Sequence, residues 1–137
     1  MKDSITGGCL CGEIRYEVPQ GNLSGTYCHC TDCQKATGVA YAFSVPIAPQ
    51  DFVLSSGDVK SYEKMADSGR KIVRNFCSNC GSMVFTGDMK TSPYIWIKVG
   101  TLDNPELVKP IQQIWTSSRQ TWSNIDADLP SFEKNPH

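Results

Sequence analysis

Histidine is scarce in this chain of 137 residues, which contains only His29 and His137. The sequence has no H-E-x-x-H motif and no Ser-His-Asp arrangement. Hydrolysis by either of these routes is therefore not expected. Any acid–base step would have to use water, a carboxylate or a metal-bound group.

The sequence also lacks any run of lysines or arginines, and its formal net charge is −1. Nucleic-acid binding normally needs a concentrated basic face, so we expect no nucleic-acid partner. The longest uncharged stretch, residues 36–50, is interrupted by Pro46 and Pro49 and is too short and too polar to span a bilayer. The N-terminal residues contain no apolar segment of the signal-peptide type. We therefore expect a cytoplasmic protein without a membrane partner.

Alternation of apolar and polar residues with a period of two dominates the sequence. In residues 13–18, for example, Ile14, Tyr16 and Val18 share one face and the charged residues share the other. Gly and Pro residues separate further segments of this kind. The strands expected from the pattern cover residues 13–18, 39–45, 71–76, 83–85 and 94–99.

Helical signals are few and short. Residues 31–36 are expected to form one or two turns, with Thr31 as N-cap and an end at Gly38. A single turn is expected at residues 104–107, with Pro105 at its first position. The sequence thus predicts a mainly β fold of antiparallel sheets with short helical connectors, in a single domain over residues 1–137.

Cysteine is abundant, and its odd number cannot be used up by disulfides alone. A cytoplasmic location also disfavours a disulfide framework, so metal ligation is the expected use. The seven cysteines lie in three clusters: Cys9 and Cys11, then Cys28, Cys30 and Cys33, and finally Cys77 and Cys80. In an extended C-x-C segment both sulfurs point to one side. In C-x-x-C a tight turn brings both sulfurs to one ion, and here Gly81 relaxes the backbone after that turn.

Seven cysteines can be divided into a group of four and a group of three, and zinc sites with four and with three protein ligands have different roles. Structural zinc takes four protein ligands, whereas catalytic zinc takes three and leaves one position for water or substrate. We therefore expect two zinc ions per chain. The expected ligands are Cys9, Cys11, Cys77 and Cys80 for a closed structural site, and Cys28, Cys30 and Cys33 for an open catalytic site. A nearby side chain that completes the central site would instead make that site purely structural.

His29 lies inside the central cluster but is not expected to bind the metal. If Cys28 and Cys30 face the ion from a strand, His29 faces away from it. An open zinc with three thiolates carries a net charge near −1. Such an ion suits an incoming thiol, whose pKa it lowers, and it can also polarise a carbonyl or bind a hydroxyl.

The three cysteine motifs resemble those of the glutathione-dependent formaldehyde-activating (GFA) family. They are residues 8–12 (GCLCG), 28–38 (CHCTDCQKATG) and 76–81 (FCSNCG). The likeness continues through residues 99–103, 114–115 and 128–132, so it covers nearly the whole chain in order. The resemblance implies an Mss4-like fold of several coiled β-sheets, and the same division of the cysteines between a structural and a catalytic zinc.

The activity that the resemblance implies is the condensation of formaldehyde with glutathione to S-(hydroxymethyl)glutathione, which is a carbon–sulfur lyase reaction. The partner would then be a small thiol or its adduct with an aldehyde. One alternative is a non-enzymatic, zinc-stabilised binding module of the same fold. Another is a redox switch in which the central cysteines form a disulfide when zinc is lost. An accessible fourth zinc position in a concave pocket would favour the enzyme, and a buried cluster or a fourth protein ligand would favour the binding module.

Glutathione carries carboxylates, so a site for it should offer cations near the zinc. The candidates are Lys35 and Arg119, and also Arg15, Lys71 and Arg74; each could instead be a solvated surface charge. Trp115 and Trp122 could line the pocket or pack as core aromatics.

Overall fold

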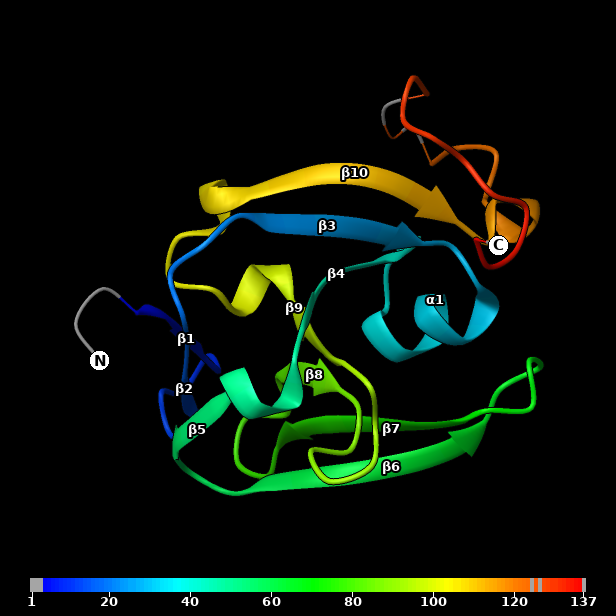
Figure 1. The fold of residues 1–137 in the computed structure, drawn as a ribbon. Helices are drawn as coiled ribbons and strands as arrows, with labels where there is room; N and C mark the ends of the chain where they lie inside the picture. The colour runs from blue at the N-terminus through cyan, green and yellow to red at the C-terminus, as the bar shows by residue number, and fades with distance from the viewer. Residues whose placement is uncertain (1–3, 124, 126, 137) are drawn as a thin grey trace.

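The structure, a computed structural model, describes residues 4–123, 125 and 127–136. Its strands form a three-stranded sheet in the order β1-β2-β5 and a seven-stranded sheet in the order β10-β3-β4-β9-β8-β7-β6 (Figure 1). The strands are β1 (Ile5–Gly8), β2 (Arg15–Val18), β3 (Leu23–Cys28), β4 (Ala42–Ile47), β5 (Val53–Ser56), β6 (Val59–Met65), β7 (Lys71–Cys77), β8 (Met83–Thr86), β9 (Ile95–Lys98) and β10 (Val108–Ile114). They are connected by the helix α1 (Thr31–Thr37) and by the 3-10 turns η1 (Pro49–Asp51), η2 (Val99–Thr101), η3 (Pro105–Leu107) and η4 (Thr116–Ser118).

These elements confirm the mainly β fold with short helical connectors. A strand lies within or across each of the five segments in which alternation predicted one, and η3 begins at Pro105 as expected. Most strand pairs are antiparallel, but β10 runs parallel to β3. A parallel pair needs a long connection, and here most of the chain lies between the two strands. None of the described helices has the length and apolar character needed to cross a membrane.

The expected N-cap of α1 was wrong by one residue. Cys30, rather than Thr31, precedes the helix with extended backbone, and its sulfur accepts a hydrogen bond from the Cys33 N–H at 3.3 Å. The helix ends at Gly38 as expected, because a φ of 78° lies in the left-handed region that favours glycine. Two cysteines of the central cluster therefore organise the first turn of α1.

The seven-stranded sheet has one strongly apolar face, because successive residues of a strand point to opposite sides. Phe85, Ile95 and Ile97 are buried on this face and belong to the same core as residues of the three-stranded sheet. The ring of Phe52 connects the two, since its centroid lies 5.4 Å from that of Tyr16 in β2 and 4.8 Å from that of Phe85 in β8. The main hydrophobic core thus joins the two sheets.

The other face of the seven-stranded sheet is more polar and faces α1. In Figure 1 the β10–β3 end of the sheet lies on one side of α1 and the β7–β6 end lies on the other. An ion pair of 2.6 Å between Lys64 in β6 and Asp32 in α1 joins the helix to the far edge of the sheet. The curved sheet and the helix thereby enclose a space between them.

Candidate metal centres and active site

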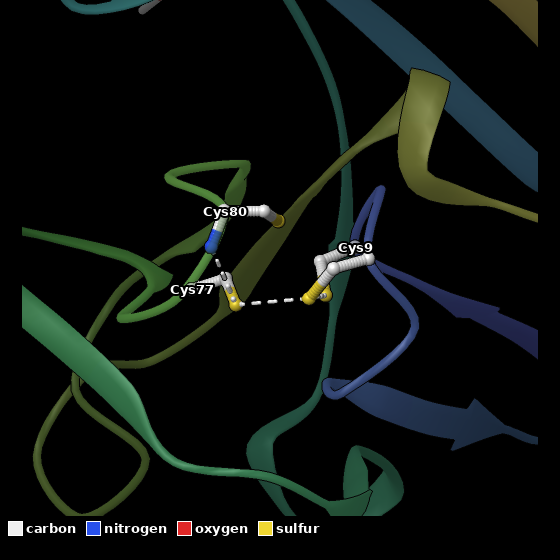
Figure 2. A group of neighbouring side chains, drawn as sticks. Cys9, Cys77 and Cys80 are labelled. Atoms are coloured by element: carbon white, nitrogen blue, oxygen red, sulfur yellow. Dashed lines mark hydrogen bonds between the residues drawn. The ribbon is translucent and has the colours of Figure 1, made fainter.

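Four cysteines meet between the two sheets. Cys9 and Cys11 lie in the loop between β1 and β2, whereas Cys77 ends β7 and Cys80 lies in the turn that follows. Their four sulfur atoms all lie within 4.8 Å of one another. Figure 2 shows the sulfurs of Cys9, Cys77 and Cys80 around one common space. The structure therefore brings together the four cysteines expected for the closed site.

The geometry of this group fits zinc. Thiolates bound at about 2.3 Å to a tetrahedral zinc stand about 3.8 Å apart. The Cys9–Cys11 and Cys11–Cys77 sulfur distances are 3.5 Å and 3.8 Å. Backbone N–H groups also donate to the sulfurs, from Ile14 to Cys9 at 3.2 Å and from Cys80 to Cys77 at 3.4 Å. Such donors favour the thiolate form that binds metal.

Ser82 supports the closed group, although the cysteine motifs alone do not point to it. Its hydroxyl lies 3.3 Å from the Cys80 sulfur and accepts a hydrogen bond from the Leu10 N–H at 3.0 Å. Hydrogen bonds from the Ser82 side chain and backbone lower the pKa of Cys80 to about 5. These contacts favour the thiolate form of Cys80. The signal in the sequence is the position of Ser82 directly after the C-x-x-C-G segment.

The three central cysteines form the second sulfur group. Cys28 ends β3, Cys30 caps α1 and Cys33 lies in the first turn of the helix. Their sulfurs lie within 4.8 Å of one another, and no fourth ligand from the described His, Cys, Asp or Glu residues joins the group. Hydrogen bonds from Cys28 and Cys33 hold the pKa of Cys30 well below its usual value. This group could hold a zinc ion through three thiolates and leave one coordination position to a ligand.

Gln34 ties the central cysteine loop to the segment after β10. Its side-chain nitrogen donates to the backbone oxygen of His29 at 2.7 Å and to that of Ser118 at 3.0 Å. Its side-chain oxygen accepts a hydrogen bond from the side chain of Gln120 at 3.0 Å. The His29 ring is fully buried, with Nε2 2.9 Å from Gln113 Oε1 in β10, so it points away from the sulfurs as expected. The cysteine motifs alone do not reveal this role of Gln34.

A cavity of about 250 Å³ opens beside the central sulfurs. All three cysteines line it, together with side chains from the polar face of the seven-stranded sheet. Pockets that enclose drug-sized ligands typically measure roughly 300–1,000 Å³, so this cavity suits a small molecule or one end of a larger one. The central group is thus half-buried on the wall of a concave pocket, whereas two of the four sulfurs of the other group are buried between the sheets.

One of the five candidate cations lines this cavity, and the structure adds two more. Arg74 is the expected one, and Lys98 and Arg70 are the additions. Burial lowers the pKa of Lys98, and the nearby cysteine thiolates oppose that effect. The remaining candidates, Lys35, Arg119, Arg15 and Lys71, do not line the cavity. Two of them form ion pairs elsewhere, Arg15 with Asp103 and Lys71 with Glu63.

The two candidate tryptophans occupy different positions. Trp115 lines the cavity, and its indole N–H donates to the side chain of Asn135 at 2.9 Å. Its backbone lies in the left-handed region with φ of 56°, which is rare for a bulky residue and is typical of functional sites. Trp122 is 72% exposed and does not line the cavity, so neither role considered for it applies.

The comparison with protein families gives a match to the model of the glutathione-dependent formaldehyde-activating enzymes over residues 4–118. The chain belongs to this family. A solved structure of a protein from Rhodobacter sphaeroides, a structural genomics target, is similar in fold. The TM-score is 0.56 at 16% sequence identity, over 93% of this chain and 98% of the other. A search of curated proteins found no match.

Membership of the GFA family agrees with the geometry of the two sulfur groups. The family binds zinc, and its name suggests glutathione-dependent activation of formaldehyde. All three cysteine motifs lie inside the matched residues, as do most of the residues that line the cavity. The part of the chain that identifies the family is therefore the part that builds both candidate metal centres.

Proposed function

We propose that this chain is a zinc-dependent enzyme of the carbon–sulfur lyase type. In this proposal it joins a thiol such as glutathione to formaldehyde or a related small aldehyde. The observation that carries the proposal is the open group of Cys28, Cys30 and Cys33, which has free sulfurs on a cavity wall and no fourth ligand among the described residues. A metal ion held there would have one side facing the cavity.

In the proposed reaction the thiol sulfur adds to the aldehyde carbon. A zinc ion held by the three central cysteines would supply Lewis acidity for the thiol or for the aldehyde oxygen. Lys98 lies in the same cavity, where its ammonium group donates to the Ser44 hydroxyl at 3.1 Å. That cation stabilises negative charge that develops on the aldehyde oxygen.

We further propose that Cys9, Cys11, Cys77 and Cys80 hold a structural zinc. Cys77 is 1% exposed and belongs to the hydrophobic core, and the four ligands come from both sheets. A closed tetrahedral site of this kind contributes directly to folding. Seven free cysteines also suit a reducing compartment, so we propose a cytoplasmic location.

The alternative is a zinc-stabilised binding module without catalysis. A buried central group or a fourth protein ligand would support it. Instead the three cysteines are only half-buried, they line a cavity and they have no fourth partner in the described part of the chain. These observations support the enzyme.

An NMR exchange measurement tests the proposal. Formaldehyde and glutathione are in equilibrium with their adduct, and the zinc-loaded protein should increase the exchange rate in proportion to its concentration. The Cys30→Ser variant, folded and lacking the central zinc, should leave the uncatalysed rate unchanged. An exchange rate that is the same with and without the zinc-loaded protein, over a range of glutathione concentrations, would exclude this activity.

A further inference from the structure

Two strands of the sheet place a cation and a hydroxyl next to each other on the cavity wall. Arg74 in β7 is paired with Thr86 in β8, and Thr86 is paired with Trp96 in β9. Lys98 lies two residues after Trp96 and therefore on the same face. All four residues line the cavity beside the central cysteines. Because β9 lies between β4 and β8, Lys98 is closer in the strand order to the sulfurs than Arg74 is.

No carboxylate of the described residues forms an ion pair with Arg74, although both Asp32 and Asp67 line this cavity. Three thiolates with one zinc would carry a net charge near −1, whereas the three cations Lys98, Arg70 and Arg74, less the one carboxylate of Asp67, contribute +2 to the same cavity wall. Asp32, which also lines the cavity, already pairs with Lys64 at 2.6 Å. The half-buried Arg74 side chain makes no ion pair or hydrogen bond with any described residue. An unpaired guanidinium in a partly enclosed space favours an anionic ligand.

Thr86 supplies an independent observation at the same place. Its hydroxyl oxygen is buried and has no hydrogen-bond partner within the described residues. Buried polar groups are almost always paired, and an unpaired one indicates that a ligand, a water or an ion completes the site. The unpaired hydroxyl lies on the residue directly across from the unpaired guanidinium. Together they offer donors to a planar oxyanion such as a carboxylate.

We propose that Arg74 and Thr86 form a carboxylate subsite of this cavity, so that the thiol or the aldehyde used by the protein carries a carboxylate close to its reacting group. The proposal rests on the proposed function and specifies its substrate class. The cavity of about 250 Å³ accommodates a compact acid, such as a mercapto acid or an oxo acid with an aldehyde group. Glutathione differs from these because its carboxylates are remote from its sulfur.

The reaction is balanced without an oxidant or a reductant. The thiol sulfur forms a bond to the aldehyde carbon, and the π electron pair of the carbonyl moves to the oxygen. The proton released by the thiol ends on that oxygen and gives a hemithioacetal. The carboxylate takes no part in bond making and remains on Arg74. Which reactant bears the carboxylate is the variable that the experiment resolves.

The test uses matched pairs of small ligands with the zinc-loaded protein. Mercaptoacetate is compared with 2-mercaptoethanol, and glyoxylate with formaldehyde. Dissociation constants come from NMR titration, and exchange rates are measured separately. In at least one pair we expect the acid to bind about tenfold or more tightly than its neutral partner. Arg74→Gln should remove this difference in affinity. Thr86→Val should reduce it by a smaller factor, and Arg74→Lys should restore part of it.

Two controls separate this subsite from the rest of the site. Lys35→Gln removes a cation of α1 that does not line the cavity, so it should leave the advantage of the acid intact. Acetate binding to Cys30→Ser tests the subsite without the central metal, and it should remain sensitive to Arg74→Gln. The subsite is overturned if acids and their neutral partners bind equally well. It is also overturned if the acid binds more tightly but Arg74→Gln and Arg74→Lys both leave that difference in affinity unchanged. If the zinc-loaded protein shows no catalysis but acetate binding still depends on Arg74, only the proposed function is contradicted.

Discussion

At the scale of single residues, Tyr16 shows how the core accommodates a polar group. The side chain is fully buried, and its hydroxyl lies 2.8 Å from the Thr101 hydroxyl. Gly7 makes room for it, because a Cβ at that position would lie 2.3 Å from the Tyr16 oxygen. Burial raises the pKa of Tyr16 to about 12. The neutral phenol is therefore the form that the fold stabilises.

This environment predicts an alkaline loss of stability. The pKa of Tyr16 is higher in the folded state than the value of about 10 in the unfolded state. The contribution of its neutral phenol to the free energy of unfolding is therefore complete below about pH 10. That contribution is lost as the pH rises towards 12. Tyr16→Phe should cost about 1 kcal/mol at neutral pH through the lost hydrogen bond, but should then lose less stability between about pH 9 and 11 than the native protein. Urea unfolding at both pH values checks this, and equal losses in the two proteins would contradict it.

Single residues also show what the sequence could not reveal about the site. The cysteine spacing predicted both sulfur groups because neighbouring ligands are close in the chain. The cations of the cavity depend on strand order, which spacing does not contain. Lys98 lay on the polar side of a predicted strand, yet only the pairing of β9 with β4 and β8 places it near the sulfurs. Arg74 was identified only as one of five candidates.

At the scale of elements, α1 is held by polar contacts because none of its residues is buried. Gln34 provides three of these contacts, to the central cysteine loop and to the segment after β10. The amide thereby fixes the position of the helix that carries Cys33. It is a positioning residue for the candidate metal centre.

Gln34→Ala should therefore weaken the central metal site while the fold is retained. Loss of a group that orients metal ligands typically reduces affinity by about 10–100-fold. The measurement is competition for zinc with a chelator of known affinity, with circular dichroism to check the fold. Lys35→Ala, at the exposed neighbouring position, is the matched control and should retain zinc like the native protein. Equal zinc affinity of the two variants would contradict the positioning role.

Elements with one regular apolar face were predictable, and the others were not. Residues 71–76 and 94–99 alternate clearly and form β7 and β9. β6 is almost entirely exposed at the edge of the sheet, so it has no apolar face to recognise. β3 is a central strand between β10 and β4 and has buried residues on both of its faces, and Gly25 interrupts its pattern. Tertiary contacts, rather than local sequence, define such strands.

At the scale of the whole molecule, the two sulfur groups occupy mechanically different positions. One joins the three-stranded sheet to the seven-stranded sheet, and the other lies on a cavity wall at the first turn of a short helix. The family match over residues 4–118 includes both groups. Loss of metal should therefore affect the fold at one group and only the site at the other.

Chelation should remove zinc in two stages. The zinc of the cavity is accessible and should leave first, with little change in circular dichroism. The zinc between the sheets should leave more slowly, together with cooperative unfolding, because it connects the sheets. Simultaneous records of released zinc and ellipticity check this prediction. Unfolding that begins with the first zinc released would contradict it.

The central claim is that four cysteines hold the fold and three hold the reactive metal. The most direct test is zinc content with zinc X-ray absorption for the native protein, Cys30→Ser and Cys77→Ser. We predict two zinc ions in the native protein, and a folded Cys30→Ser protein with one zinc bound by four sulfurs. Cys77→Ser should lose its fold, because structural zinc contributes about 10–16 kcal/mol in small zinc modules. Equal collapse of both variants, or a single zinc in the native protein, would contradict the division.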